Sequence, residues 1–134
     1  MTRDEIAFVM KDLIHLNDSG IGLYRYGQGL TVDERAVKLQ QDREQLLRRE
    51  VECTKVYEWL CQMNKIRSIN IYHNSYELKH LAERTIGYVT NGAFIVAAIH
   101  RGFECRRDRY TQNIFINISN KSVTAEAKRV GIVL

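Results

Sequence analysis

The chain has 134 residues, of which 45% are apolar and 27% charged, and it carries a net charge of +4 and no proline. This composition is typical of a soluble globular protein. The chain is long enough to bury a hydrophobic core that is stable without disulfide bonds or a bound metal ion. No apolar run reaches the roughly 20 residues that a membrane helix needs. The acidic, amphipathic N-terminus also lacks a signal-peptide core, so we expect a cytoplasmic protein that does not associate with membranes.

The charge is distributed unevenly along the chain. Residues 1–63 contain nine Lys and Arg against eleven Asp and Glu, whereas residues 64–110 contain eight against four and residues 111–134 contain three against one. Such an excess of positive charge in one half is a cue for a nucleic-acid or acidic partner. Three cysteines without a CxxC pair favour reduced thiols over a disulfide framework or a zinc site.

The first element expected is a helix over residues 2–17. Thr2 and Glu5 form a capping-box pattern, and apolar residues then recur at helical spacing. The glycine-rich segment 20–30 follows. It lacks the Lys-Ser/Thr and the preceding strand of a phosphate-binding loop, so it predicts a flexible loop or short hairpin. The alternative is a contact with bases or phosphates through its central residues, Tyr24, Arg25 and Tyr26.

Residues 31–64 predict the longest helix, opened by a second capping box at Thr31 and Glu34. A seven-residue apolar repeat runs through it, formed by Leu39, Leu46, Cys53 and Leu60. An unbroken helix of this length would span about 50 Å, more than a small domain, so part of it is expected to project or the helix to break. Its apolar seam needs a partner, either the first helix folded back or the same helix of a second subunit in a homodimer.

A strand, two helices and a hairpin are expected next. Apolar and polar residues alternate over 66–72, which predicts a strand. Asn74 with Glu77 then forms a third capping box, which predicts a helix over 75–86 with Lys79 on its outer face. A second helix follows Thr90 or Asn91 and stops at Gly102. Apolar and polar residues alternate again over 103–118, which predicts a β-hairpin with a basic tip. A last helix over 121–130 is expected to stop at Gly131.

The order of strand, helix, turn, helix and basic hairpin over residues 66–118 resembles the winged helix-turn-helix family. That resemblance implies that the second helix enters the DNA major groove while the hairpin, or wing, contacts the backbone. Arginines on an extended tip suit this role because they neutralise phosphates and release counterions. The residues expected at such an interface are Arg106, Arg107, Arg109, Tyr110, Lys79, Arg84, Arg101, Thr90 and Asn91.

The second helix departs from the family pattern. GAFIVAAIHR presents almost no polar side chain before His100, although a recognition helix reads base edges with polar groups. Only Thr90 and Asn91 are candidate base readers. The alternative is that this helix is the buried centre of the core, or an interface with a partner. The string from SYELKHLAER to NIFINIS also resembles uncharacterised small proteins of bacterial mobile elements and phages, which implies a role in element maintenance or in countering host defence.

The sequence contains no catalytic, cofactor or metal signature. The four histidines do not share ligand spacing within one element. Cys105 follows the strand pattern, which favours inward packing, although Arg106 and Arg107 beside it are a reason to expect a lowered thiol pKa. We therefore expect a protein that is not an enzyme and that holds neither cofactor nor metal.

Two functional hypotheses remain at this point. The first is a small DNA-binding protein that contacts the backbone of double-stranded DNA through its wing. The second is a protein-interaction factor, such as an inhibitor or adaptor, that docks on a larger nucleic-acid-handling complex. The fold class expected for either is mainly α with a small antiparallel sheet. A helical region over 1–64 and a winged-helix-like basic region over 65–134 are expected to form one cooperative unit.

Overall fold

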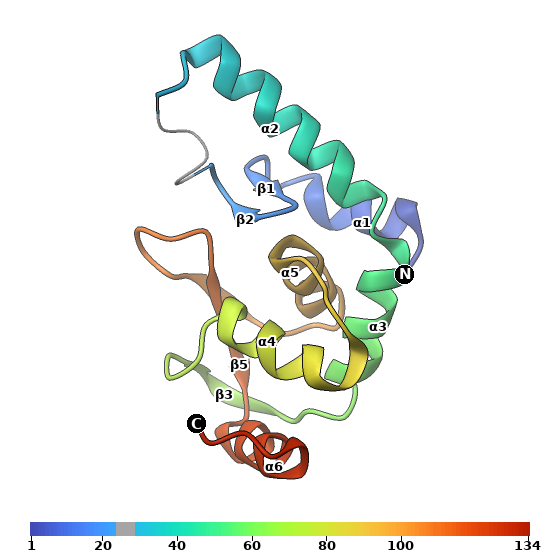
Figure 1. Cartoon of the computed structure of the whole chain (residues 1–134), viewed down its shortest axis with the longest axis vertical. Helices are drawn as coiled ribbons and strands as arrows, with labels where there is room; N and C mark the ends of the chain where they lie inside the picture. Colours follow the sequence, from blue (N-terminus) through green and yellow to red (C-terminus); the bar gives the residue numbers. More distant parts are fainter. Residues whose placement is uncertain (24–28) are drawn as a thin grey trace.

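Helix α5 (Asn91–His100) lies at the centre of the fold, where residues 91–98 are buried. It packs against α1 (Arg3–Met10), α3 (Glu50–Leu60), α4 (Ser75–Ile86) and β2 (Gly20–Ile21), as Figure 1 shows. A helix that is apolar on every face is stable only when neighbours cover all of those faces. The prediction that this helix forms the packed centre of the core is therefore confirmed.

The structure is a computed structural model that describes residues 1–23 and 29–134. The predicted contact through Tyr24, Arg25 and Tyr26 lies outside the described residues. Both halves of the chain contribute to one continuous hydrophobic core, which extends from Ile6 in α1 to Ala127 in α6 (Asn120–Val130). No helix among the described residues combines the length and the apolar content needed to cross a membrane.

Helix α1 ends at Met10, so the predicted extension to residue 17 was wrong. Its Thr2–Glu5 capping box is present. The guanidinium of Arg43 donates to the carbonyl oxygens of Met10 (3.2 Å), Leu13 (2.8 Å) and Leu16 (2.8 Å). Because this distant side chain satisfies carbonyls that a continuing helix would have bonded internally, the chain turns instead. The segment β1 (Leu16–Asn17) then pairs antiparallel with β2.

The predicted long helix breaks in two at residues 48–49. Helix α2 (Val32–Leu47) begins with the expected Thr31–Glu34 capping box, and α3 follows after Arg49. The apolar seam is buried within the chain itself at Leu46, Cys53 and Leu60. The first half of α2 projects from the body as an arm, and residues 31–37 are exposed (Figure 1).

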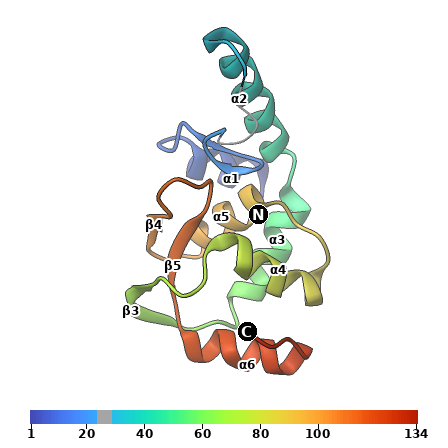
Figure 2. The same cartoon turned by 60° about the vertical axis from the view of Figure 1, so that its left-hand side comes forward.

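A three-stranded antiparallel sheet lies along one side of the molecule (Figure 2). Its strands are β3 (Lys65–Asn70), β4 (Cys105–Arg107) and β5 (Ile114–Ile118), in the order β3-β5-β4. Ile114, Ile116 and Ile118 turn inward and are buried. The predicted β-hairpin and the class of a mainly helical protein with a small antiparallel sheet are confirmed.

The predicted helix over 75–86 coincides with α4, and that over 121–130 agrees with α6 to within one residue. Cys105 is exposed, so the expected inward packing was wrong. Partial desolvation raises the pKa of its thiol, which is the opposite of the lowering considered beside two arginines. In the core, burial raises the pKa of Cys53 to about 12, so that thiol stays protonated.

Candidate functional site

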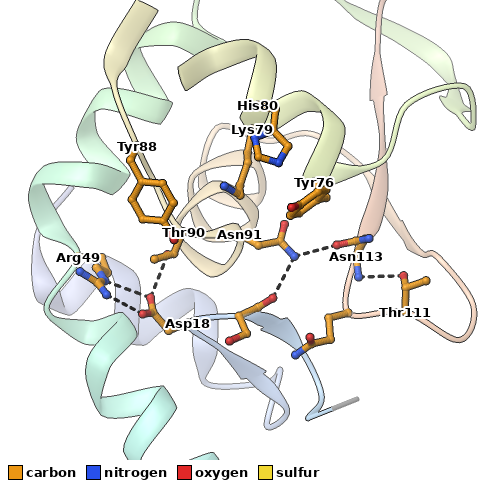
Figure 3. Close-up of a pocket in the computed structure, with 12 residues that line it drawn as sticks. Asp18, Arg49, Tyr76, Lys79, His80, Tyr88, Thr90, Asn91, Thr111 and Asn113 are labelled. Atoms are coloured by element: carbon orange, nitrogen blue, oxygen red, sulfur yellow. Dashed lines mark hydrogen bonds and ion pairs between the residues drawn. The ribbon is translucent and has the colours of Figure 1, made fainter. Parts of the chain in front are cut away.

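A cleft of about 680 Å³ lies between the turn after β1, the N-terminus of α5, the start of α4 and the tip of the β4–β5 hairpin (Figure 3). Its volume falls within the range of roughly 300–1,000 Å³ that ligand pockets occupy. The residues that line it are Asp18, Ser19, Arg49, Tyr76, Lys79, His80, Tyr88, Thr90, Asn91, Thr111, Gln112 and Asn113.

The floor of the cleft is the turn at residues 17–20, which is held against α5. Asn17 shapes the turn, because its Oδ1 accepts from the backbone N–H of Ser19 (2.9 Å) and its Nδ2 donates to the carbonyl of Gly22 (2.8 Å). The carbonyl of Asp18 accepts from the N–H of Gly92 in the first turn of α5 (3.0 Å). A β-carbon on Gly92 would overlap the Asn17 carbonyl, so this close contact requires glycine.

Asp18 joins three segments of the chain. Its carboxylate accepts from Nη2 (2.8 Å) and Nε (3.1 Å) of Arg49 and from Oγ1 of Thr90 (2.9 Å). The hydrogen bonds from Arg49 to Asp18 raise the pKa of that guanidinium. A two-bond arginine–carboxylate pair is geometrically specific, so it fixes α3 relative to the turn.

Thr90 is engaged in hydrogen bonds within the protein rather than exposed toward a DNA groove. Its Oγ1 accepts from the N–H of Ala93 (3.1 Å) and caps α5, while its own N–H donates to the carboxylate of Glu52 (3.0 Å). The residue is 7% exposed. Its predicted exposure as a base reader on an accessible helix end was therefore wrong.

Asn91 is also 7% exposed, and its side chain is only half satisfied. Nδ2 donates to the carbonyl of Ser19 (3.1 Å) and to Oδ1 of Asn113 (2.9 Å). Because a backbone carbonyl can only accept, the first bond fixes which atom of the Asn91 amide is nitrogen. Its Oδ1 is buried without a partner among the described residues and faces the cleft (Figure 3).

Lys79 was expected on the outer face of α4, and that placement was wrong. It is 4% exposed, and its Nζ lies 3.0 Å from Oε2 of Glu83. The ammonium also lies 5.4 Å from the ring centre of Tyr76 and 4.8 Å from that of Tyr88. Burial pushes the pKa of Glu83 upward, but the hydrogen bonds from Lys79 and from the N–H of Val89 outweigh it and leave the pKa lowered. Lys79 is thus committed to an internal ion pair and two aromatic contacts.

Two exposed tyrosines stand at the mouth of the cleft. Tyr76 is 50% exposed and Tyr88 is 74% exposed. His80 packs edge-on against Tyr76 with ring centres 4.3 Å apart, and its Nδ1 lies 2.7 Å from Oε1 of Glu83. Sequence reasoning missed these rings together with Asp18 and Arg49, because no helical or strand period relates them.

The hairpin tip forms one wall of the cleft through residues 111–113. Arg109 and Tyr110 are exposed and directly precede that wall, and Tyr110 adopts a φ of 70°. Arg107 braces the tip, since its Nη2 donates to the carbonyls of Thr111 (3.1 Å) and Ile21 (3.4 Å). Arg106 is exposed on β4, paired with Phe115. The hairpin thus meets Asn91 through residues 111–113, and the predicted residues Arg106, Arg107, Arg109 and Tyr110 do not line the cleft.

Two predicted site residues lie outside both the hairpin and the cleft. Arg101 follows the last residue of α5, at the opposite end of the helix from Asn91 and about 15 Å away along its axis. Arg84 is exposed in the last turn of α4 and does not line the cleft. Acidic residues also interrupt the basic hairpin, since Glu104 is exposed beside it and Asp108 accepts from Nδ2 of Asn74 (3.3 Å).

Within residues 1–23 and 29–134, no three His, Cys, Asp or Glu side chains are placed to hold a metal ion. No protein-family model, curated protein or solved structure matches the chain. The hairpin and the cleft are therefore the features from which a function can be inferred.

Proposed function

We propose that this chain binds nucleic acid without catalysing a reaction, and that the β4–β5 hairpin contacts the phosphate backbone. The observation that supports this most is the exposure of Arg106 and Arg109 together with Tyr110 on one hairpin. Arginine guanidinium groups bind phosphate through several donors at once. Each phosphate they neutralise releases counterions, which gives affinity without dependence on sequence.

The proposed binding relies on the backbone rather than on a helix in the major groove. Helix α5 is buried over residues 91–98, so its side chains are not presented to base edges. Arg107 is occupied in bracing the hairpin tip. Arg106 and Arg109 are therefore the residues proposed to contact phosphates, on double-stranded DNA or on single strands.

A salt titration of binding tests the proposal. Fluorescence anisotropy with labelled DNA is expected to show binding at about 50 mM salt that weakens steeply as salt increases. Replacing Arg106 and Arg109 by Ala removes two phosphate contacts and, for double-stranded DNA, is expected to reduce the slope of log K against log salt by about 1.8.

A matched control removes the same charge elsewhere. Lys121 and Lys128 are exposed on α6, so a double alanine variant there changes the net charge equally. Absence of binding at low salt would refute the proposal. Equal weakening by the two double variants would also refute it, since the hairpin would then have no special part.

A second candidate function is that of a protein-interaction factor, an inhibitor or adaptor, which uses the α2 arm. Val32 is 83% exposed and Val37 is 57% exposed on a projecting helix. A helix segment without tertiary packing is only marginally stable in water, so a bound partner or second subunit would stabilise it. Light scattering across micromolar concentrations tests the homodimer, which replacing both valines by Lys is expected to dissociate. A monomer at every concentration would contradict the homodimer.

A further inference from the structure

We propose that the cleft beside the hairpin binds one unpaired nucleobase, with Oδ1 of Asn91 accepting a hydrogen bond from a base N–H. This inference rests on the proposed function, because the hairpin would hold the phosphates of the same strand. The inference goes further by naming the base as the part of the nucleic acid that enters the protein. A base can enter the cleft only if it is unpaired, which points to single strands or to a flipped-out nucleotide.

The unpartnered oxygen of Asn91 identifies the kind of group that the cleft accepts. Its Nδ2 is anchored by the Ser19 carbonyl and by Asn113, so the side chain cannot turn its oxygen elsewhere without losing both bonds. A buried acceptor without a donor carries a free-energy penalty that an N–H of a ligand would remove. All the common bases carry an N–H donor on their Watson–Crick edge, so the oxygen by itself selects a base rather than a particular one.

The walls of the cleft suit a flat ring. Tyr76 and Tyr88 flank its opening, with Lys79 between them (Figure 3). Both tyrosine residues keep at least half of their surface exposed. Stacking on tyrosine faces is tolerant of base identity and is a common mode of binding to single strands.

The charges favour a neutral group inside the cleft and phosphates outside it. The two cations that line the cleft are already paired, Arg49 with Asp18 and Lys79 with Glu83, so neither is free for a phosphate. The positive charge available to a phosphate is on the hairpin tip, where the exposed Arg109 lies two residues before the wall formed by residues 111–113. One nucleotide can therefore place its base in the cleft while its phosphate meets the hairpin.

Three single strands of equal charge, each about ten nucleotides long, separate the base from the backbone. The first is abasic throughout, the second carries one central thymine, and the third carries N3-methylthymine at that position. Thymine has a single ring N–H, which the methyl group removes. At about 50 mM salt we expect the thymine strand to bind about tenfold more tightly than the abasic strand, and the methylated strand to lose most of that gain.

Matched tyrosine variants assign the gain to the cleft. Tyr88→Ala is expected to abolish the tenfold gain while leaving the affinity for the abasic strand unchanged. Tyr72, which is 77% exposed and does not line the cleft, provides the control, and Tyr72→Ala should alter neither affinity. Equal affinity of wild-type protein for the abasic and thymine strands would overturn the inference while leaving the proposed phosphate binding intact.

A nucleoside, which carries no phosphate, tests the base site independently of the proposed phosphate binding. Thymidine titrated into isotopically labelled protein is expected to shift the side-chain NH₂ resonances of Asn91 and the backbone amides of residues 111–113 in NMR spectra. If none of the strands binds but these shifts occur, the proposed function fails and the base site stands. If the resonances do not move at saturating thymidine, the base site is refuted.

Discussion

Replacement of Gly92 by Ala tests the contact on which the cleft is built. Gly92 lies in the first turn of α5, directly against the turn that carries Asp18. A β-carbon there would overlap the carbonyl oxygen of Asn17 and lie 2.9 Å from Cα of Asp18. These neighbours are backbone atoms, so the clash cannot be relieved by a side-chain rotation.

The expected magnitude follows from three contributions. Alanine is better than glycine in a helix by up to about 1 kcal/mol, which acts in favour of the variant. Overpacking a closely packed contact costs about 1–3 kcal/mol. Separation of the turn from the helix also breaks the hydrogen bond from Gly92 N–H to the Asp18 carbonyl, at about 1 kcal/mol. The variant is therefore expected to be less stable by about 1–3 kcal/mol.

Urea unfolding followed by the fluorescence of Trp59, the single tryptophan, measures this change. With a slope of about 2 kcal/mol per molar, the midpoint should fall by about 1 M. Gly131→Ala is the control, because Gly131 has a φ of 78° but open space around it, so backbone strain acts there without a clash. If Gly92→Ala proves neutral or more stable, the close approach of turn and helix is wrong, and with it the geometry of the cleft floor.

Other substitutions test the remaining contacts. Lys79→Ala should reduce the free energy of unfolding, measured in urea, by about 3 kcal/mol, because the half-buried Glu83 loses its cationic partner and keeps only the N–H of Val89 and His80. An unchanged value would place Lys79 at the surface. Hydrogen bonds from Arg129 and Trp59 lower the pKa of Glu126 below its ordinary 4.5, so the stability it contributes is complete above that pH and is lost as the pH falls through the lowered value. Urea midpoints measured between about pH 5 and pH 3 should therefore fall, and less so in Glu126→Gln; parallel pH profiles would contradict this assignment. Tyr110→Asn should raise the free energy of unfolding by about 0.5–1 kcal/mol, because Asn tolerates the positive φ, while a lower free energy of unfolding would mean that the Tyr110 ring stabilises the tip.

The local signals in the sequence predicted local structure well. Capping residues at Thr2, Thr31 and Asn74 accept the expected backbone hydrogen bonds, and α4 has the predicted bounds. The period of two over residues 103–118 correctly predicted the hairpin. Such features depend on contacts within a few residues, so the chain order contains the information they need.

The candidate site was predicted only in part. The sequence identified Asn91, which lines the cleft, but it placed Asn91 on an accessible helix end rather than in a buried position. It also interpreted Lys79 as a surface residue, since a lysine in the first turns of an amphipathic helix is usually solvated. The burial of Lys79 depends on Tyr88, which follows the end of α4 and folds back over the ammonium.

The sequence by itself determined where most helices and strands begin, that the apolar helix is central, and that positive charge gathers on the hairpin. The tertiary structure decided where α1 ends, through Arg43, and where the cleft forms, through Asp18. Asp18 and Thr90 are hydrogen-bonded across 72 positions of the chain. Periodicity and capping patterns describe neighbours within one or two helical turns, whereas an acceptor left unpaired at Asn91 exists only because distant segments pack around it. The most specific evidence for a ligand therefore became visible only in the folded chain.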